Sequence, residues 1–226
     1  DHVALRYNKR IMSVVHNGYD LINFSPSALA KDAWLHEFGE HNEIPLLGMV
    51  GRYDPSKDHE NLLTALALLK SRSKKFKCFL VGQGLDENNV ELNNLILRHR
   101  LTDDVRILGP RDDVPIIMNG LDIHILSSSM EAFPNVLAEA MCCETPCIST
   151  AVGDVEILIG DTGWLVPPKS PTDLADAIEE AIIELDTPEW PKRQRLCRER
   201  IKENFNIERM IEEYHSIWQT IPLSGS

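Results

Sequence analysis

The stretch LDIHILSSSMEAFPNVLAEAM, residues 121–141, decides the fold, because it joins a predicted buried strand directly to a predicted buried helix. Asp122–Leu126 is short and mostly apolar, which is typical of a strand that helices cover on both faces. Pro134 suits the first position of a helix, since its missing N–H would go unpaired there anyway. The residues that follow leave no broad polar face, so the helix Pro134–Cys143 should be mostly buried.

The same alternation of strand-like and helix-like segments continues through the rest of the chain. It predicts an α/β fold built on a doubly wound, Rossmann-like parallel sheet. Ligands of such sheets bind at the carboxyl ends of the strands, so the residues after each strand are the candidates for function. The predicted strands are Leu46–Val50, Phe76–Val81, Val105–Leu108, Asp122–Leu126, Cys147–Ser149 and Gly163–Val166, and the predicted helices are Asn61–Ser71, Val90–His99, Val114–Asn119, Pro134–Cys143, Thr172–Leu185, Pro191–Asn204 and Ile207–Ile221.

The charge balance limits the ligands that the surface can attract. The 226 residues include 35 Asp and Glu against 23 Lys and Arg, a formal net charge of −12. A surface that negative repels phosphodiester backbones, so we do not expect nucleic acid to be a partner. Any positive charge that serves a phosphate ligand must therefore be concentrated locally.

The cysteines and the apolar runs indicate a cellular location. The five cysteines have no CxxC spacing, and four of them lie within apolar runs. This is typical of reduced core thiols, so we predict a cytoplasmic protein. The sequence contains no signal-peptide pattern and no apolar run of membrane-spanning length. The amphipathic helix Ile207–Ile221 has a polar face of mixed charge, so we expect it to dock on the core or on another domain rather than on a membrane.

Residues 1–45 fall outside the strand–helix repeat. The segment IMSVVHNGYD, residues 11–20, reads as a strand that runs into a turn at Asn17-Gly18. A short helix and a linker are predicted between this turn and the first core strand. The chain begins without Met, which leads us to expect an excised fragment. The predicted organisation is a remnant of an N-terminal domain or interdomain connection (1–25), a Rossmann-like ligand-binding domain (26–206), and a C-terminal helix and tail (207–226).

The first predicted strand ends in MVGRYDPSKDHENLL, where Gly51 permits a tight exit. Arg52 and Lys57 are the only cations of this loop before the next helix, for which Asp58 is a good N-cap. Two cations above a helix N-terminus, at the carboxyl end of a strand, suit a diphosphate. The alternative is solvated surface charge, paired with Asp54 and Asp58.

The second and third predicted strands end in loops that contain glycine. Gly82 and Gly84, in LVGQGLDE, lack the third glycine of the dinucleotide fingerprint, so we expect a tight turn against the ligand cleft. The third strand ends in ILGPRDDV, where the backbone around Arg111 is able to offer amide groups to a base.

Two carboxylates frame the helix that starts at Pro134. The free N–H groups of this helix, from Asn135 onward, suit an anion or a sugar oxygen. Glu131 precedes them and is placed to accept hydrogen bonds from hydroxyls. Glu139 lies inside an apolar helix, where an ionised acid needs strong donors. Ligand hydroxyls are one source of these donors, and a buried Arg or a backbone amide is the other.

Metal and nucleophile chemistry are not indicated. The sequence has no DxD, the usual carboxylate cradle for a metal–diphosphate complex, and its eight histidines lack ligand spacing. Ser127–Ser129 follow a strand but lack the GxSxG elbow of a serine hydrolase. His124, within an apolar strand, is interpreted as a core residue rather than a ligand. We therefore expect no metal and no other cofactor.

Taken together, six segments of the chain resemble retaining glycosyltransferases of family 4, which have the GT-B fold. The E-x7-E element, from Glu131 to Glu139, is the most specific of them. The resemblance implies that this chain is the C-terminal, donor-binding half of such an enzyme, and that the acceptor-binding N-terminal domain is missing. The segments, which match in order and spacing over roughly residues 12–221, are VHNGYDLINFSP, VGRYDPSKDHENLLTAL, LVGQG, ILGPRDDVP, LDIHILSSSMEAFPNVLAEAM and VGDVEILIGDTGWLVPP.

The resemblance also assigns roles to individual positions. It implies that Arg52 and Lys57 hold the donor diphosphate and stabilise the leaving group, while Glu131 contacts hydroxyls of the donor sugar. It places Glu139 at the ribose hydroxyls and the backbone near Arg111 at the base. The remaining donor-binding positions, which act through their backbone, are Gly51, Gly82, Phe133, Pro134, Asn135 and Val136.

Three positions depart from the usual pattern of the family. Ala132 stands where glycine is frequent, and Asp58 follows the lysine where glycine is usual. Glu144 replaces the glycine of the family's ACGTP element. Glu144 therefore needs an exposed position or a partner.

The implied reaction is transfer of a sugar from a nucleotide-diphosphate donor to a glycan or lipid-linked acceptor, with retention and without a metal. Its main requirement is charge stabilisation of the departing nucleotide. The expected partners are a nucleotide sugar and the missing N-terminal domain, and the full-length enzyme is compatible with peripheral association with the cytoplasmic face of a membrane. Two alternatives remain open: a nucleotide-sugar epimerase of similar fold, and a non-catalytic nucleotide-sugar-binding module.

Overall fold

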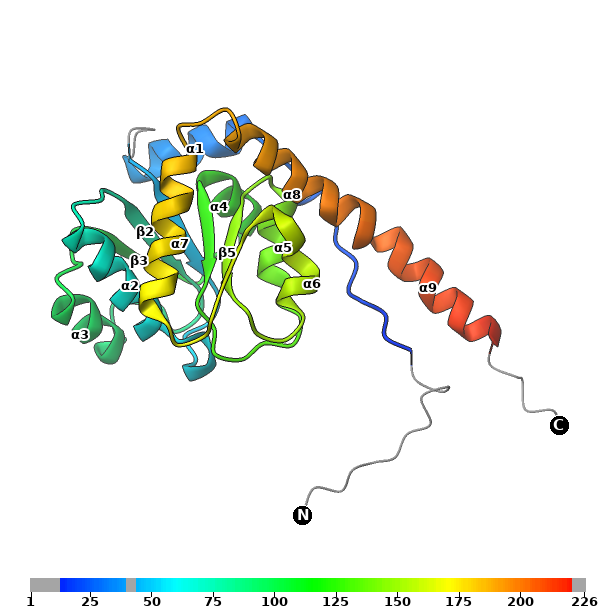
Figure 1. The fold of residues 1–226 in the computed structure, drawn as a ribbon, viewed down its shortest axis with the longest axis horizontal. Coiled ribbons are helices and arrows are strands. Elements are labelled where there is room, and N and C mark those ends of the chain that lie inside the picture. The colour runs from blue at the N-terminus through cyan, green and yellow to red at the C-terminus, as the bar shows by residue number, and fades with distance from the viewer. Residues whose placement is uncertain (1–12, 40–43, 221–226) are drawn as a thin grey trace, which may run out of the picture.

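The computed structural model describes residues 13–39 and 44–220, and six parallel strands form its single sheet (Figure 1). The strand order is β3-β2-β1-β4-β5-β6. β1 pairs in parallel with both β2 and β4, so the chain returns across the sheet between β3 and β4. The strands are β1 (Leu46–Val50), β2 (Lys77–Val81), β3 (Val105–Gly109), β4 (Ile123–Leu126), β5 (Cys147–Thr150) and β6 (Trp164–Val166).

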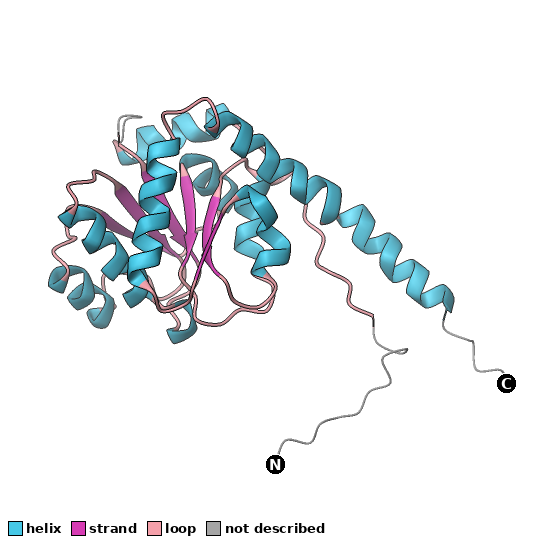
Figure 2. Ribbon diagram, viewed as in Figure 1, coloured by secondary structure: helices cyan, strands magenta, loops and turns pink. Residues whose placement is uncertain are grey.

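Helices cover both faces of the sheet, which Figure 2 shows as a magenta layer between cyan helices. α2, α3, α7 and the first residue of α8, Trp190, contribute to the hydrophobic cluster on one face. α1, α4, α5, α6 and the rest of α8 contribute to the cluster on the other. The helices are α1 (Ala28–Phe38), α2 (His59–Ser71), α3 (Val90–Arg98), α4 (Val114–Gly120), α5 (Asn135–Cys142), α6 (Val155–Ile159), α7 (Pro171–Glu184), α8 (Trp190–Asn204) and α9 (Ile207–Thr220), with short 3-10 turns η1 (Pro55–Lys57) and η2 (Gly160–Thr162).

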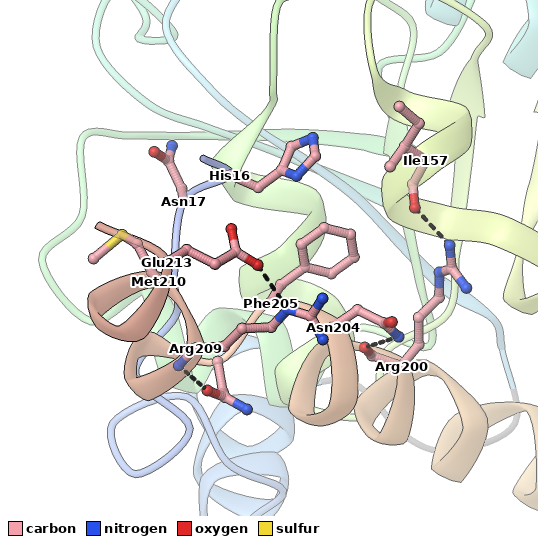
Figure 3. A pocket seen from close by; sticks show the side chains of 10 residues that line it. His16, Asn17, Ile157, Arg200, Asn204, Phe205, Arg209, Met210 and Glu213 are labelled. Carbon is pink, nitrogen blue, oxygen red and sulfur yellow. Dashed lines mark hydrogen bonds and ion pairs between the residues drawn. The ribbon is translucent and has the colours of Figure 1, made fainter. Parts of the chain in front are cut away.

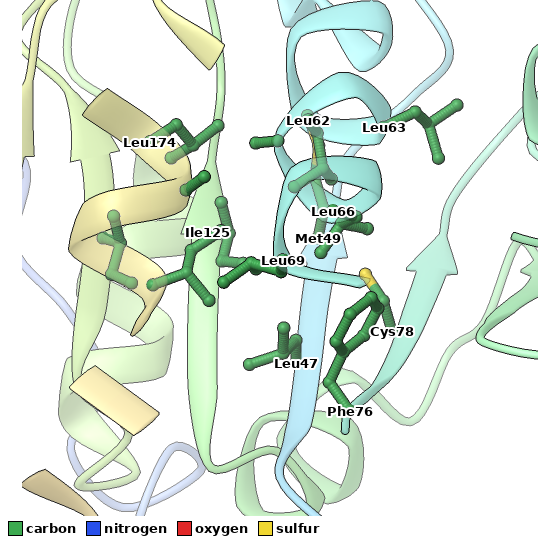
Figure 4. Close-up of a cluster of buried hydrophobic side chains, with 14 of the residues drawn as sticks. Leu47, Met49, Leu62, Leu63, Leu66, Leu69, Phe76, Cys78, Ile125 and Leu174 are labelled. Carbon is green, nitrogen blue, oxygen red and sulfur yellow. The ribbon is translucent and has the colours of Figure 1, made fainter. Parts of the chain in front are cut away.

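The sheet divides the core in two, because successive residues of a strand point to opposite faces. Leu47 and Met49 of β1 belong to the cluster shared with α2 and α7, which Figure 4 shows in part. Leu46 and Val50 of the same strand belong to the cluster on the opposite face. All five residues of β1 are buried, which explains why this strand is an uninterrupted apolar run in the sequence.

The predicted elements agree closely with the structure. Each of the six strands and seven helices predicted after residue 45 is found, and the ends differ by at most two residues, although Ile221 lies outside the described residues. The doubly wound parallel sheet is therefore confirmed. The short helix expected before the first core strand is α1, whereas residues 40–43 of the expected linker lie outside the described residues.

The structure differs from the sequence-based prediction in three places. Residues 13–18 form no strand, because no strand of the sheet lies beside them, and only Tyr19 makes an isolated bridge, to Asn206; residues 11–12 lie outside the described part. Pro134 is the N-cap, with ψ 107°, so α5 begins one residue later than expected. The five-residue helix α6 lies in a stretch expected to be loop. The helix was not predicted, because its apolar run is short and lies between glycines.

The first described residues are joined to the end of α8. The amide of Tyr19 donates to the carbonyl of Phe205 at 2.9 Å. The guanidinium of Arg198 donates to the carbonyls of Leu21 and Phe24, each at 3.0 Å. These contacts fix the start of the described chain to the second face of the sheet. The division into residues 1–25, 26–206 and 207–226 stays a prediction.

The last helix, α9, extends away from the body of the molecule (Figure 1). Ile211 and Trp218 on this helix are 58% and 67% exposed. Among the described residues, neither hydrophobic cluster includes a side chain beyond Phe205, so docking of α9 on the core is not observed. Docking on another domain stays a prediction. Within the described part of the chain, no helix has the length and apolar character to cross a membrane.

Asp58 and Glu144, two of the positions that depart from the pattern the sequence resembles, both have left-handed backbones. Their φ angles are 50° and 61°, a conformation that favours glycine. Asp58 is the predicted N-cap of α2, and its carboxylate accepts from the amide of Asn61 at 3.2 Å. Glu144 is partly exposed, as expected, and its amide closes the end of α5 by donating to the carbonyl of Met141 at 3.1 Å.

Candidate functional site

The candidate site lies where the strand order reverses, between β1 and β4. In doubly wound sheets, the crevice at such a point is where ligands bind. Lys57, from the loop after β1, and Glu131, from the loop after β4, meet there with Nζ 2.6 Å from Oε1. Their side chains are 16% and 13% exposed. Two of the three predicted catalytic residues are thus in direct contact.

Ser128 also contacts Glu131, and sequence reasoning missed this contact. Its hydroxyl donates to Oε1 of Glu131 at 2.7 Å, the oxygen that also accepts from Lys57. The signal that could have revealed it is local, since serine hydroxyls commonly bond groups three residues away in turns.

Gly51 and Gly82 bring the loops after β1 and β2 into contact. The amide of Gly51 donates to the carbonyl of Val81 at 2.8 Å. Gly82 has φ 147°, and a Cβ there would lie 2.1 Å from the carbonyl oxygen of Gly51. Only glycine allows this approach, so the expected tight turn is present. The aliphatic stem of Lys57 lies over Gly51, with Cε 3.6 Å from the position of a Cβ.

Gly153, in the loop after β5, supports the backbone around Glu131, although it was not among the predicted site residues. Its φ is 55°, and a Cβ would lie 2.3 Å from the carbonyl oxygen of Glu131. The next amide, that of Asp154, donates to the carbonyl of Ala132 at 2.9 Å. The signal in the sequence is a single VGD after a strand, which does not reveal its distant partner.

The amino end of α5 presents free backbone donors beside Glu131. The amide of Leu137 donates to the carbonyl of Pro134 at 3.2 Å. The amides of Asn135 and Val136 make no hydrogen bond within the described ranges. Such amides, at the positive end of a helix, are suited to anionic or sugar oxygens.

The side chains at this end of α5 hold the leading segment of the chain. Oδ1 of Asn135 accepts from the hydroxyl of Tyr19 and from Nδ2 of Asn17, both at 3.0 Å. The ring of Phe133 lies 5.1 Å from that of His16. Oδ1 of Asn135 and the ring of Phe133 are thus engaged within the chain, while the resemblance implies that the backbone of these residues contacts the donor.

Glu139 lies one turn beyond Asn135, on the same face of α5. Burial raises the pKa of its carboxyl, and its charge contributes, after burial, to the raised pKa of Tyr19. In the part of the chain that the structure describes, no side chain or amide donates to this carboxylate. The structure places Glu139 next to Tyr19 and does not bring it into contact with Lys57.

Arg52, the third predicted catalytic residue, is the most open of the three. Its side chain is 69% exposed, and Nε lies 3.5 Å from Oδ2 of Asp54. Hydrogen bonds from Ser56, more than this pairing, lower the pKa of Asp54. The arrangement of Arg52 is the solvated pair with Asp54 that was the alternative to a diphosphate contact, whereas Lys57 has a different partner.

The side chain of Arg111 is paired with two carboxylates. It donates to the carboxylates of Glu37, on α1, and of Asp113, with shortest distances of 2.6 Å to each. Hydrogen bonds from these two partners raise the pKa of Arg111. A role for the backbone near Arg111 in contacting a base stays a prediction.

Two buried histidines lie near Lys57. Burial, reinforced by the charge of Lys57, lowers the pKa of His59 to about 4 and that of His124 to about 3. Nε2 of His124 accepts from the amide of Val50 at 3.4 Å, and both ring nitrogens of His59 lack a partner among the described residues. His124 is confirmed as a core residue. Both rings are neutral at pH 7, so Lys57 supplies the positive charge at this point.

The cysteines and other metal-ligating groups do not form a site. All five cysteines are free and buried, and burial raises the pKa of Cys78 and Cys197 to about 12. Residues 13–39 and 44–220 contain no group of three or more His, Cys, Asp or Glu side chains able to hold a metal. The expectation that the reaction needs no metal stays a prediction.

A separate hollow of about 210 Å³ lies where the start of the described chain meets the junction of α8 and α9 (Figure 3). None of the predicted site residues lines it. Both of its arginines have partners, since Arg200 donates to the carbonyl of Leu158 at 2.7 Å and Arg209 to Glu213 at 3.0 Å. This hollow is distinct from the crevice between β1 and β4.

The parallel sheet, its reversal point and the paired Lys57 and Glu131 define a Rossmann-like ligand-binding domain. The chain belongs to the family of group 1 glycosyl transferases, which it matches over residues 31–213. It is 33% identical over 176 residues to the D-inositol 3-phosphate glycosyltransferase of Mycobacteroides abscessus, an alignment that covers 76% of this chain and 39% of that protein. The resemblance drawn from the six segments is confirmed.

Two solved structures have the same fold. A glycosyltransferase from Rickettsia africae superposes with a TM-score of 0.85 at 24% identity, covering 94% of this chain and 58% of that one. HepE from Anabaena, in complex with UDP and glucose, superposes with a TM-score of 0.82 at 25% identity, covering 92% and 57%. The chain therefore spans between about two fifths and three fifths of the length of these relatives.

Proposed function

We propose that this chain is the donor-binding half of a GT-B glycosyltransferase, which transfers a sugar from a nucleotide-diphosphate donor with retention and without a metal. The observation that carries the proposal is the contact between Lys57 and Glu131 at the crevice between β1 and β4. A cation suited to a diphosphate and a carboxylate suited to sugar hydroxyls meet where such sheets bind ligands. The transferase names of the relatives above favour transfer over an epimerase or a non-catalytic module.

In this proposal, Lys57 and Arg52 act on the leaving group. Lys57 donates to a diphosphate oxygen, and Glu131 accepts from hydroxyls of the donor sugar, so the donor lies across the present ion pair. Arg52 is exposed and only loosely paired, so it is free to turn toward a second phosphate oxygen. Positive charge held at the departing diphosphate stabilises the transition state more than the ground state.

The amino end of α5 completes the donor site in this proposal. The unpaired amides of Asn135 and Val136 meet phosphate or sugar oxygens. The carboxylate of Glu139, which lacks a described donor, accepts from the ribose hydroxyls, whose two adjacent O–H groups match a carboxylate. Gly51 and Gly82 shape the loops around the donor. UDP is the first nucleotide to test, because the structure of HepE contains it.

The acceptor site belongs to the rest of the parent protein. We infer that a preceding domain supplies it, since the relatives are about twice as long as this chain. A glycan or a lipid-linked acceptor is the class that we expect, with the parent enzyme in the cytoplasm or at the cytoplasmic face of a membrane. On this basis the chain alone binds a nucleotide and transfers nothing.

A thermal-shift panel tests the proposal. The chain is melted alone and with UDP, GDP, ADP and the glucose conjugate of each. We expect one nucleotide pair to raise Tm, because a ligand that binds only the folded state stabilises it by about 2.7 kcal/mol at 100 times its Kd. The absence of a shift with all six compounds at millimolar concentration would contradict the proposal.

A further inference from the structure

We propose that Ser127–Ser129 form a clamp that holds Lys57 and Glu131 together, and that Ser128 is the positioning residue that turns one oxygen of Glu131 toward the donor sugar. This inference rests on the proposed function, and it gives a role to a serine run that lacks the GxSxG elbow of a serine hydrolase. The three residues leave the end of β4 in sequence. Ser127 and Ser129 contact the loop after β1, whereas Ser128 contacts Glu131 within its own loop.

Ser127 and Ser129 hold the loop that carries Lys57. The buried hydroxyl of Ser127 lies 2.9 Å from the carbonyl oxygen of Lys57 and 3.0 Å from that of Asp58, so it donates to both as a shared hydrogen bond. The amide of Ser129 donates to the carbonyl of Ser56 at 2.7 Å. Three successive carbonyls of the β1 loop are thus tied to the end of β4. Lys57 is therefore placed by β4, the strand whose loop also carries Glu131.

Ser128 controls the orientation of the Glu131 carboxylate. Its side chain is fully buried, and its own carbonyl accepts from the hydroxyl of Thr150 on β5 at 2.5 Å, so Ser128 is itself fixed. Oε1 of Glu131 accepts from both Ser128 and Lys57. Oε2 accepts no hydrogen bond from the described residues. With one oxygen held by two donors, the carboxylate cannot rotate freely, and Oε2 remains available for a ligand hydroxyl.

Loss of the Ser128 hydroxyl is therefore predicted to weaken binding of the donor sugar more than binding of the nucleotide. When Lys57 turns to a diphosphate, Ser128 is the remaining donor that keeps Oε1 in place. Without the hydroxyl, the Glu131 carboxylate can rotate about its last bond, which has a broad torsional preference. Contacts with the sugar then weaken, whereas the contacts of Lys57 and α5 with the nucleotide are retained.

The test is the pair of dissociation constants for UDP and UDP-glucose, measured by calorimetry on the chain and on Ser128→Ala; if the thermal-shift panel selects another base, its matched pair replaces them. We expect Ser128→Ala to weaken UDP-glucose by about 10-fold, the effect of one lost hydrogen bond to a charged group, with UDP changed by less than about 2-fold. Ser128→Thr, which keeps the hydroxyl, should restore the ratio, and Ser128→Cys should resemble alanine.

Ser71→Ala is the control, because Ser71 is the last residue of α2 and its hydroxyl donates to the carbonyl of Leu68 at 2.7 Å, outside the clamp. Both constants should be unchanged in this variant. Equal weakening of UDP and UDP-glucose in Ser128→Ala would mean a merely structural role and overturn the proposal, as would no change in either. A wild-type chain that binds UDP but distinguishes no sugar overturns this inference alone, whereas a chain that binds none of the six panel compounds overturns the proposed function.

Discussion

At the scale of single residues, Glu139 is a partly buried carboxyl that destabilises the ligand-free protein. A residue with this effect indicates a ligand that it binds. Burial raises its pKa, so the folded state binds a proton more readily than the unfolded chain. Between the unfolded value near 4.5 and the raised folded value, stability falls as pH rises, because the folded state holds the extra proton. Burial of the Glu139 carboxyl therefore lowers the free energy of unfolding at pH values above about 4.5.

Glu139→Gln separates stability from binding. In the ligand-free chain at pH 7, we expect its urea midpoint to be equal to or higher than that of the wild type, since the buried charge is gone. Nucleotide affinity should fall, because an amide is a weaker acceptor for ribose hydroxyls than a carboxylate. Denaturation and UDP calorimetry on the same samples check both. A variant that is less stable and binds UDP normally would show that Glu139 is structural.

His59 and His124 should make the fold sensitive to mild acid. Their folded-state pKa values of about 4 and about 3 lie below the ordinary 6.5, so between these limits the unfolded chain binds more protons than the folded one. Stability therefore decreases as pH falls from about 6.5 toward 4, by roughly 1.4 kcal/mol per pH unit for each histidine.

Urea denaturation between pH 7 and pH 4 measures this dependence. Replacing His59 with Leu should flatten the slope by about one histidine's share. A wild-type stability that is constant over this range would show that the two buried rings do not have lowered pKa values.

At the scale of elements, two tight turns are built with residues other than glycine. Asp58 and Glu144 both have left-handed backbones, which cost a residue with a Cβ roughly 1 kcal/mol. Asp58 recovers part of this cost by capping α2. No hydrogen bond or ion pair from the Glu144 side chain is found within the described ranges.

Glu144→Gly should therefore stabilise the chain, by up to about 1 kcal/mol, because the strain is removed without loss of a contact. Asp58→Gly should gain less, because it also removes the cap. Urea midpoints of the two variants, measured beside the wild type, give the comparison. Stabilisation by Asp58→Gly that exceeds that of Glu144→Gly would mean that the cap contributes little.

Two kinds of element were predictable from the sequence: strands that helices cover on both faces, and helices with a long amphipathic pattern. β1 is an unbroken apolar run, and β2 is one after Lys77, because helices cover both faces of the sheet. These runs predict the ends of the two strands to within one residue. α6 was not predicted, because five residues between glycines carry too little periodicity. The contacts of Ser128 and Gly153 with Glu131 were not predicted either, since they depend on how loops that are distant in the sequence meet.

The candidate site was predictable only in part for the same reason. The spacing and chemistry of the loops marked Lys57, Glu131 and Glu139, because loops after parallel strands gather at one edge. The sequence could not show that Lys57 pairs with Glu131 while Arg52 remains in solvent. That outcome depends on the strand order, which places β4 directly beside β1.

At the scale of the whole molecule, α9 lies apart from the compact body. The hydrophobic clusters include Phe205 but no later described residue, so the core is complete without this helix. Deletion of residues 207–226 should therefore change Tm by only a few degrees and leave UDP binding intact.

Deletion from Trp190 onward is the contrasting truncation. It removes Cys197 and Ile201, which are fully buried, and should prevent cooperative folding. Melting curves of the two truncated chains give the comparison. Loss of cooperative melting on removal of α9 alone would show that this helix belongs to the folded unit.

Because the net charge is −12, most of the surface repels an anionic ligand. Binding of such a ligand therefore depends on a local positive charge. At the reversal point of the sheet, a diphosphate would meet both the positive charge of Lys57 and the free amides of α5. Replacing Lys57 removes a charge-assisted hydrogen bond, which is worth about 1.5–3 kcal/mol.

Calorimetric titration of UDP-glucose, or of the matching conjugate if another base is selected, into Lys57→Met tests the account most directly, with Lys70→Met as the control. Lys70 is also on the first strand–helix unit, but it pairs with Asp104 and is 41% exposed. The account predicts a Kd weaker by about 10-fold to 150-fold for Lys57→Met and no change for Lys70→Met. Equal affinity for the wild type and Lys57→Met would contradict it.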